Sequence, residues 1–429
     1  MALQSALSEV TSRLPSSADA PDAKPGRLPF LEPWVKGTPP DMTAICARLA
    51  AICQQVKPTA PRQPDASATD LIGVLCPALA ELRTQNPMRP LCVLALDYDR
   101  QPPVHIPLSP ITAFISLAKV LSYEERVALY EGNAQLALDD MAISRKIITG
   151  LQKQPLLISG LVAVGLSEIQ LVVVQQGLAD HVWTDAQLTQ LDADLGNVDI
   201  LSNGRFWIAG DVVFFNIPTA EYYQVHRWLS ARELSAVQGK WEDADSDDPK
   251  YWARIVYWLT PKGRFDLDYA DYARFELLGT VKAIDPSSRR VFPDRLAALL
   301  HSRVGVYSHV FTDQPFLDDV KSTTSSVESF AYGQVHLDEA RIACRLERYR
   351  LAQGHYPDSL NQLVLAFGNK LPQDIMTGAP YRYRIQPDGT YLLYSVAWDQ
   401  EDEDGQGPQK GQTPKDAPDW VWPSHADKK

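Results

Sequence analysis

The sequence predicts an α+β fold, in which a predominantly α-helical N-terminal and middle region precedes a C-terminal module of one long helix and a small antiparallel sheet. From Ser109 onwards, apolar residues recur at three- and four-residue steps, which is the spacing of amphipathic helices. A later stretch, roughly Val327 to Gln353, keeps helical spacing but is apolar on two opposite sides. Tyr381 to Gln386 alternates residue by residue instead, which is the period of a strand.

Composition and charge are those of an ordinary globular protein and exclude nucleic acid as a partner. The 429 residues are 45% hydrophobic and 22% charged, with a formal net charge of -12. Such a chain repels phosphate backbones and anionic membrane surfaces. The cysteines lack zinc-site spacing, and we expect most of them to be small buried hydrophobes. They are Cys46, Cys53, Cys76, Cys92 and Cys344.

Three parts of the chain differ in pattern. Residues 1–65 are rich in proline and are predicted to be an arm or linker, with one helical island from Met42 to Val56. Residues 66–320 are predicted to form a mainly helical domain, and residues 321–429 the α+β module. Inside the helical domain, residues 205–217 fit either a strand pair or a helix, because short apolar runs do not discriminate between the two.

Local signals place further elements in the helical domain. We expect a helix from Leu71 to Leu82 and a short strand from Leu91 to Leu96. A helix start at Ser122 should lead into a helix that ends near Leu151. Thr184 is the expected N-cap of a later helix, because Asp185, Ala186 and Gln187 follow it.

One apolar stretch has the length of a membrane span. Between Pro155 and Ala179 the single charged residue is Glu168, but several serines and glutamines interrupt the run. A carboxylate in the middle of a bilayer costs about 2.5–3.5 kcal/mol, and the flanks carry no basic cluster. We therefore interpret the stretch as a buried helix of the helical domain and expect no transmembrane helix.

The long C-terminal helix is predicted to be buried on two faces, because a surface helix has a single apolar stripe. One face should contact the small sheet and the other the helical domain, so the seam between the two parts is expected to be fixed and apolar. The first stripe consists of Val335, Ile342, Leu346 and Tyr349, and the second of Leu337, Ala340, Cys344 and Leu351.

Turn signals divide the remaining residues of the module. Gly354 is the expected C-cap of the long helix, and a second helix should follow Ser359. Strand 381–386 should point Tyr381, Tyr383 and Ile385 inward. The turn at residues 387–389 should return the chain as a partner strand over residues 391–398.

The order of motifs in this last quarter resembles the globular part of the major pseudopilin of type II secretion systems. The chain has GHYPDSL at residues 354–360, TGAPY at residues 377–381 and LYSV at residues 393–396. The resemblance covers roughly residues 325–407. It implies one long helix, a YP-x-S-L loop, a D-P-x-G-x-P-Y turn and a short antiparallel sheet. Ile375 stands where that family usually has proline.

The whole chain also resembles a class of bacterial envelope proteins in which a helical region precedes a pseudopilin-like end. The residues that carry this resemblance are GNAQLALDD at 132–140, PLLISGLV at 155–162 and DWVW at 419–422. This resemblance implies the architecture of the chain but no activity.

The pseudopilin resemblance also implies calcium. In that family the corresponding acidic loop, residues 399–405 here, binds calcium through backbone carbonyls and aspartate side chains. Asp399, Asp402 and Asp404 are then the charged candidates, and Ser395 is a further oxygen donor. The spacing is not that of an EF-hand, because Gly411 would occupy the twelfth position. A solvated loop is the alternative interpretation.

The beginning of the chain departs from the pseudopilin pattern. Residues 1–30 show no apolar segment of a signal peptide, and the prepilin cleavage motif with its apolar helix is not seen. We expect that the protein is not a filament subunit. The alternative is an anchor removed before Met1, which would place the protein in the envelope or periplasm, whereas otherwise it would be cytoplasmic.

Catalytic motifs are missing from the sequence: it has no nucleophile elbow, phosphate-binding loop, H-E-x-x-H or dinucleotide fingerprint. The acidic residues 243–248 are interpreted as a solvated loop.

The leading hypothesis is therefore a non-catalytic envelope scaffold whose pseudopilin-like module contacts a protein partner. The rival is a hydrolase or ligand-binding enzyme with its site at the seam between the two parts. A closed seam favours the first, and a deep polar cleft the second.

Overall fold

The computed structural model describes residues 79–88, 108–225, 275–303 and 313–423 without 369 and 410, together with single positions at 92, 96, 98, 103, 106, 263 and 273. The predicted arm over residues 1–65 and the acidic residues 243–248 lie outside the described residues. So does most of the strand expected at 91–96. Of the helix expected at 71–82, residues 79–82 are described, and they lie in a helix that continues to residue 85.

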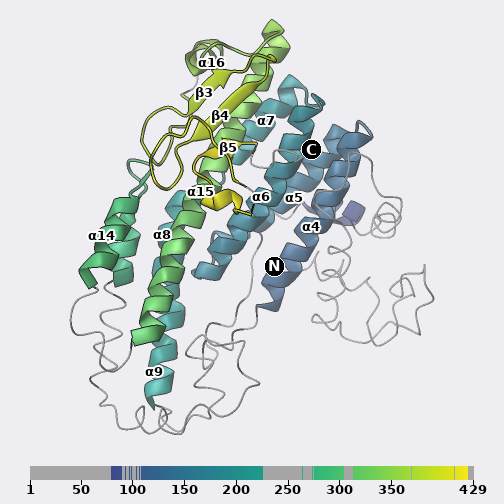
Figure 1. Cartoon of the computed structure of the whole chain (residues 1–429). Helices are drawn as coiled ribbons and strands as arrows, with labels where there is room; N and C mark the ends of the chain where they lie inside the picture. The colour runs from purple at the N-terminus through teal and green to yellow at the C-terminus, as the bar shows by residue number, and fades with distance from the viewer. Residues whose placement is uncertain are drawn as a thin grey trace, which may run out of the picture.

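The helical domain is a set of neighbouring helices connected by short turns (Figure 1). Helix α4 contacts α5 and α6, α5 contacts α6, and α6 contacts α8. The elements are α4 (Ser109–Tyr130), α5 (Ala134–Leu151), α6 (Leu157–Ala179), α7 (Asp185–Gly196), α8 (Ile200–Asp211), the π-helical turn η4 (Val212–Asn216) and α9 (Ile217–Val225).

The observed boundaries correct one prediction and decide another. Helix α4 runs through Ser122 without a break, and the chain turns instead at Gly132, whose φ of 78° favours glycine. The residues following Ser122 are buried inside α4, so no new helix begins there. Residues 205–217 are helical, which removes the strand-pair alternative. Thr184 is confirmed as an N-cap, and it forms a capping box with Gln187.

Helix α6 is the predicted apolar helix. Among the described residues it is the one helix long and apolar enough to cross a membrane, and 56% of its most apolar window is buried inside the protein. Its charged residue, Glu168, contacts His336 at 3.1 Å, and Gln170 donates hydrogen bonds to Glu125. Because these polar groups have partners within the chain, the arrangement favours the core helix of a folded domain.

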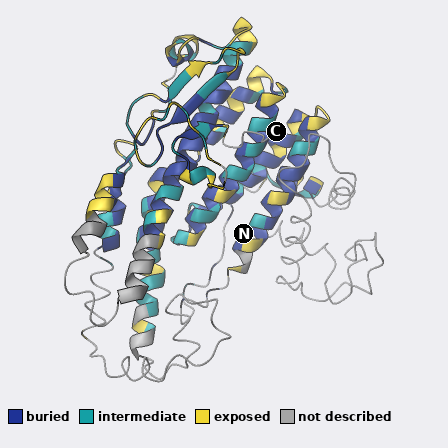
Figure 2. Ribbon diagram, in the orientation of Figure 1, coloured by how far each residue is buried: buried dark blue, intermediate teal, exposed yellow. Residues whose placement is uncertain are grey.

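Helix α15 (Asp313–Gln353) lies between the helical domain and the sheet (Figure 1). It contacts α6, α7 and α8 on one side, and α16 (Leu360–Phe367), β4 (Tyr391–Ser395) and β5 (Trp420–Trp422) on the other. The helix begins 14 residues before the predicted Val327, and the predicted domain boundary at residue 321 falls inside it. Its middle is buried over most of its circumference (Figure 2).

Both predicted stripes of α15 are buried, with one exception. Val335, Ile342 and Leu346 of the first stripe have no exposed surface, and Tyr349 is half-buried. Leu337, Ala340 and Cys344 of the second stripe are at most 1% exposed. Leu351, however, is 45% exposed, because the last turn of the helix, like the residues that follow it, projects into solvent.

The sheet has the strand order β3-β4-β5 and is antiparallel throughout, with β3 spanning Arg382–Ile385. The predicted hairpin is confirmed in the pairing of Tyr383 with Leu393. The third strand, β5, was not expected. Ile385 was expected to face inward but is 38% exposed. The reason is that β3 forms the outer edge, while β4 and β5 contact α15 (Figure 1).

A connecting region ties the module to the helical domain from a second direction. It comprises the π-helical turn η5 (Phe275–Thr280), α13 (Val281–Ala283), the paired short strands β1 (Ile284–Asp285) and β2 (Arg290–Val291), and α14 (Pro293–Arg303). The amide of Val291 donates to the carbonyl of Ile375 at 3.0 Å, which joins β2 to the loop before β3.

Glycines permit the closest contacts of α6. A Cβ atom at Gly160 would lie 2.4 Å from the Trp207 ring of α8, and Trp207 in turn packs against Phe330 of α15 with ring centroids 5.2 Å apart. At Gly165, on the same helix, nothing lies within 4 Å of a built Cβ. A larger residue therefore cannot fit at Gly160 without displacing Trp207, whereas the space at Gly165 can hold one.

We expect Gly160→Ala to lower the free energy of unfolding by about 1–3 kcal/mol, the usual cost of overpacking a core. Gly165→Ala is the matched control, and it should raise that free energy by about 0.5–1 kcal/mol, because alanine loses less backbone entropy in a helix. Urea denaturation followed by circular dichroism measures both. Equal effects of the two substitutions would contradict the close contact between α6 and α8.

Candidate functional site

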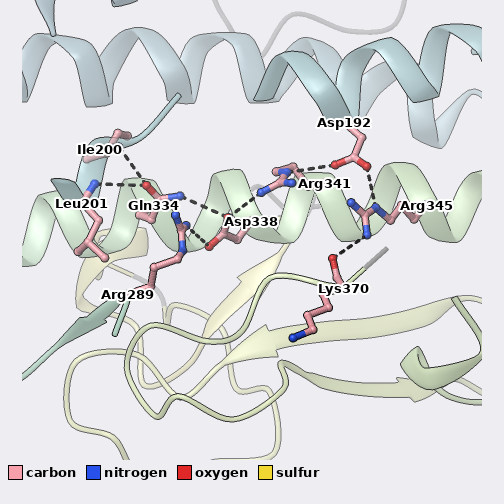
Figure 3. Close-up of polar contacts among 9 residues, drawn as sticks. All are labelled: Asp192, Ile200, Leu201, Arg289, Gln334, Asp338, Arg341, Arg345 and Lys370. Atoms are coloured by element: carbon pink, nitrogen blue, oxygen red, sulfur yellow. Dashed lines mark hydrogen bonds and ion pairs between the residues drawn. The ribbon is translucent and has the colours of Figure 1, made fainter. Parts of the chain in front are cut away.

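One edge of α15 carries the charged residues Asp338, Arg341, Arg345 and Arg348, and it forms a network with α7 (Figure 3). Asp192 of α7 accepts hydrogen bonds from Nε of Arg341 at 3.1 Å and from Nε of Arg345 at 2.6 Å. Arg345 also donates through Nη1 to the carbonyl of Lys370 at 3.1 Å, in the loop leading to β3. One arginine therefore joins the helical domain, the long helix and the module.

A second acidic residue of α15 lies one turn away. Asp338 is fully buried and accepts from Nε2 of Gln334 at 3.3 Å and from Nη2 of Arg289 at 3.4 Å. The side-chain oxygen Oε1 of Gln334 accepts hydrogen bonds from the backbone amides of Ile200 and Leu201. These amides begin α8 and have no partner within that helix, so α15 caps α8 through this glutamine.

Burial dominates the electrostatics of this region. It raises the pKa of Asp338 to about 6, although the charges of Arg289 and Arg341 oppose the shift. The neighbouring Glu339 is also fully buried, and neither of its carboxyl oxygens has a hydrogen-bond partner among the described residues. Burial, with the charges of Asp374 and Glu168, raises the pKa of Glu339 well above its usual value. The neutral form of Glu339 is therefore favoured.

The seam was expected to be apolar, and this is correct only in part, because His336 contacts Glu168 of α6 and Gln334 caps α8. Where α15 faces α6 and α8, Phe330 and Gly333 make apolar contacts with Trp207 and Val164. Where α15 faces α7, the contact is ionic, because Asp192 there is the shared partner of two arginines. Sequence periodicity gave no sign of the acid on α7 that pairs with Arg341 and Arg345.

Each of the four residues proposed as calcium ligands has a polar partner within the chain. Ser395 is fully buried, and its hydroxyl donates to Asp374 at 3.0 Å. Asp402 accepts from Nε of Arg382 at 2.8 Å and from the hydroxyl of Tyr394 at 2.9 Å. Asp404 lies 3.7 Å from Arg384. Asp399 is exposed and accepts from the amide of Glu401 at 3.1 Å.

Asp419 organises the acidic loop, and sequence reasoning missed this role. Its Oδ2 accepts from the amides of Glu403, Gly405 and Gln406 at 3.1, 2.9 and 3.0 Å. Its other oxygen, Oδ1, is buried without a hydrogen-bond partner among the described residues, as is Oε2 of Glu403. The signal in the sequence was the position of Asp419 directly before the apolar residues of β5.

These carboxyl groups repel one another. Burial raises the pKa of Glu403, and the charges of Asp399, Asp419 and Glu401 raise it further. Carboxylate oxygens are the donors that calcium prefers, so the donor chemistry of Asp399, Glu403 and Asp419 fits that ion. Among the described residues, however, no three His, Cys, Asp or Glu side chains are grouped closely enough to hold a metal.

Comparison with protein-family models, with curated proteins and with solved structures gives no match to this chain. The resemblance to the pseudopilins therefore rests on the motifs of residues 354–396. The structure has a long helix, a short helix and an antiparallel sheet in that order, which is consistent with an α+β fold. This agreement does not extend to the pseudopilin fold itself.

We expect Asp192→Asn to lower the free energy of unfolding by about 3–5 kcal/mol, because it leaves buried Arg345 without its counter-ion. The side chains of Asp192 and Arg345 are 12% and 6% exposed. Asp185→Asn is the matched control on α7. Asp185 pairs with Arg348 but is 60% exposed, so its loss should cost at most about 1 kcal/mol. Similar costs for both substitutions in urea denaturation would contradict the importance of the buried network.

Proposed function

We propose that this protein is a non-catalytic scaffold or protein-interaction protein of the cell envelope, whose C-terminal part is a pseudopilin-like module. The observation that carries the proposal is the deep burial of four acid–base candidates on α15 and beside it. Asp338, Glu339, Asp374 and His336 are at most 1% exposed. A substrate cannot reach groups so deeply covered, whereas groups of this kind can hold two parts of a protein together.

The way in which the two parts are joined supports the same role. Helix α15 belongs to both parts, and the ionic contacts of Asp192 and the cap from Gln334 to α8 fix its rotation and height against the helical domain. A scaffold requires a constant geometry between the surfaces that it presents. The envelope location and the protein partner follow from the resemblance of the motifs.

The alternative is a ligand-binding or hydrolytic enzyme with its site at the seam. One observation favours it: Glu339 is buried without a hydrogen-bond donor, and its pKa is raised. Perturbed acids of this kind concentrate at functional sites. The two proposals differ in whether the seam opens to solvent in the native protein.

Cys344 reports on that opening, because it is a fully buried free thiol in the seam. We expect N-ethylmaleimide to modify Cys344 of the native protein more than about a thousandfold more slowly than in the urea-unfolded chain, since a closed seam exposes it only on unfolding. Peptide mapping by mass spectrometry identifies the labelled cysteine.

The control is Leu351→Cys, at the exposed end of the same helix, which should react rapidly in the native protein. If native Cys344 reacted at a rate close to that of this control, the seam would open readily. That result would overturn the scaffold proposal in favour of a ligand site at the seam.

We also propose that calcium stabilises the module by binding the acidic loop. The resemblance suggested Asp399, Asp402, Asp404 and Ser395 as ligands. Glu403 and Asp419 each have one buried carboxyl oxygen without a hydrogen-bond partner in the described part of the chain, so these two residues, together with Asp399, are the stronger candidates. A divalent cation among these carboxyl groups would relieve their mutual repulsion.

Calcium at a hundredfold excess over its Kd is expected to raise the free energy of unfolding by about 2.7 kcal/mol. Asp399→Ala should remove most of this gain. Asp402→Asn is the matched control and should retain the gain, because Asp402 is engaged by Arg382 and Tyr394. Melting temperatures measured in calcium and in chelator test both variants, and identical values for the unmodified protein would leave the solvated-loop interpretation.

A further inference from the structure

Glu339 is buried at the point where α15 meets both parts of the protein. The acids whose charges act on it most strongly are Asp374 in the loop before β3, Glu168 on α6 and Asp338, its neighbour on α15. Its side chain is fully buried, and neither carboxyl oxygen has a hydrogen-bond partner among the residues that the structure describes. Within this part of the chain, Glu339 therefore lies among groups of its own charge and without a donor.

Two of these acids differ from Glu339 in having a basic partner. Asp338 accepts a hydrogen bond from Nη2 of Arg289 at 3.4 Å, and Glu168 lies 3.1 Å from Nδ1 of His336. The other ring nitrogen of His336, Nε2, is buried without a hydrogen-bond partner in the described structure, so it does not bond to Glu339 either. The basic groups on this part of α15 are thus engaged by other acids.

The polar groups on the sheet side are an acid and two hydroxyl groups. Asp374 is 1% exposed and accepts from the hydroxyl of Ser395 at 3.0 Å. The hydroxyl of Tyr381 is buried without a hydrogen-bond partner among the described residues. Burial raises the pKa of Tyr381 well above its usual value, and the charges of Asp338, Asp374 and Glu339 raise it further. These groups therefore bring no positive charge to Glu339.

Three arginines near the region have other acceptors. Arg382 of β3 donates through Nε to Asp402 at 2.8 Å, and Arg290 of β2 donates through Nη2 to a backbone carbonyl at 2.7 Å. Arg341 of α15 donates through Nε to Asp192 at 3.1 Å. None of the three bonds to Glu339, since its carboxyl oxygens have no partner in the described structure.

The electrostatics agree with this geometry. Burial raises the pKa of Glu339 well above the ordinary value of 4.5, and the charges of Asp374, Glu168 and Asp338 raise it further. The amide of Ser395 has the opposite and smaller effect, and it makes no hydrogen bond to the carboxyl group. An ionised group in an interior requires a counter-ion or several donors, and without them it takes up a proton instead.

We propose that Glu339 is a structural proton-binding residue, which allows the sheet to pack on α15 and α6 only as the neutral acid. Unfolding exposes the carboxyl group to water, and at neutral pH the proton then leaves to solvent. The contact between the two parts of the protein is thereby linked to pH. The inference holds whether or not the protein is a scaffold, because it concerns how the seam is held together.

The direction of the effect follows from linkage. The folded state holds the proton of Glu339 more tightly than the unfolded state, in which the ordinary pKa of 4.5 applies. Below pH 4.5 both states carry the proton, and its contribution to stability is complete. As the pH rises further, only the unfolded state releases the proton, so the equilibrium constant of unfolding increases by up to about tenfold per pH unit. The increase ends at the pKa of the folded state.

Urea denaturation of the full-length protein between pH 5 and pH 8 tests the inference, with Glu339→Gln as the variant. The glutamine has nearly the same shape and no proton to release. The equilibrium constant of unfolding of the unmodified protein, divided by that of the variant, should therefore rise by up to about tenfold per pH unit. Other titrating groups contribute little to this ratio, because both proteins contain them. A purely steric role of Glu339 would change the ratio by the same factor at every pH.

Glu131→Gln is the matched control, because Glu131 is exposed at the end of α4, and its ratio should not change with pH. Glu339→Met also removes the proton site, and it replaces Glu339→Gln if circular dichroism shows that the glutamine variant does not fold. A ratio for Glu339 that stays constant with pH would overturn the inference. So would a ratio that falls as the pH rises, which would mean that the folded protein stabilises the ionised carboxylate.

Discussion

The burial of α15 on two sides is the constraint on which most of the structure depends. A helix with one apolar stripe would leave either the helical domain or the small sheet without a partner surface. Because Leu346 and Cys344 are both fully buried, the helix contributes core residues to two layers at once. The rotation of such a helix is restricted, since any turn about its axis would bring a charged edge into an apolar contact. The arginine contacts to Asp192 and the carbonyl of Lys370 place the charges of this edge against polar partners.

Polar residues inside the protein follow the same logic. Glu168 and Gln170 interrupt an otherwise apolar α6, yet each meets a polar group on a neighbouring helix, His336 of α15 or Glu125 of α4. Buried polar groups without partners are costly, so such pairs favour one register of the helices over others. In this respect the polar groups of α6 specify the arrangement that its apolar residues stabilise.

Sequence reasoning reached the features that depend on neighbours along the chain. The two stripes of α15, the N-cap at Thr184 and the hairpin around residue 388 all follow from local periodicity or turn chemistry. It failed where distant residues decide the outcome. The break at Gly132 rather than Ser122 reflects the burial of Glu124 and Glu125, which look like surface residues in the sequence. The pairing of Asp192 with α15, and the loop amides gathered by Asp419, join residues that are far apart in the chain or separated by irregular backbone. No periodic pattern encodes such contacts.

The continuity of α15 also bears on how the protein folds. The segment that resembles a pseudopilin begins inside this helix, so the two parts meet within an element and not at a linker. An insertion or deletion of one residue within α15 would turn one end of the helix relative to the other by about 100°, so that the two stripes would no longer continue along it. Folding depends on the same continuity of α15. Neither part can complete its core before α15 has formed, and we therefore expect the described regions to assemble as one cooperative unit, with no stage at which the module stands alone.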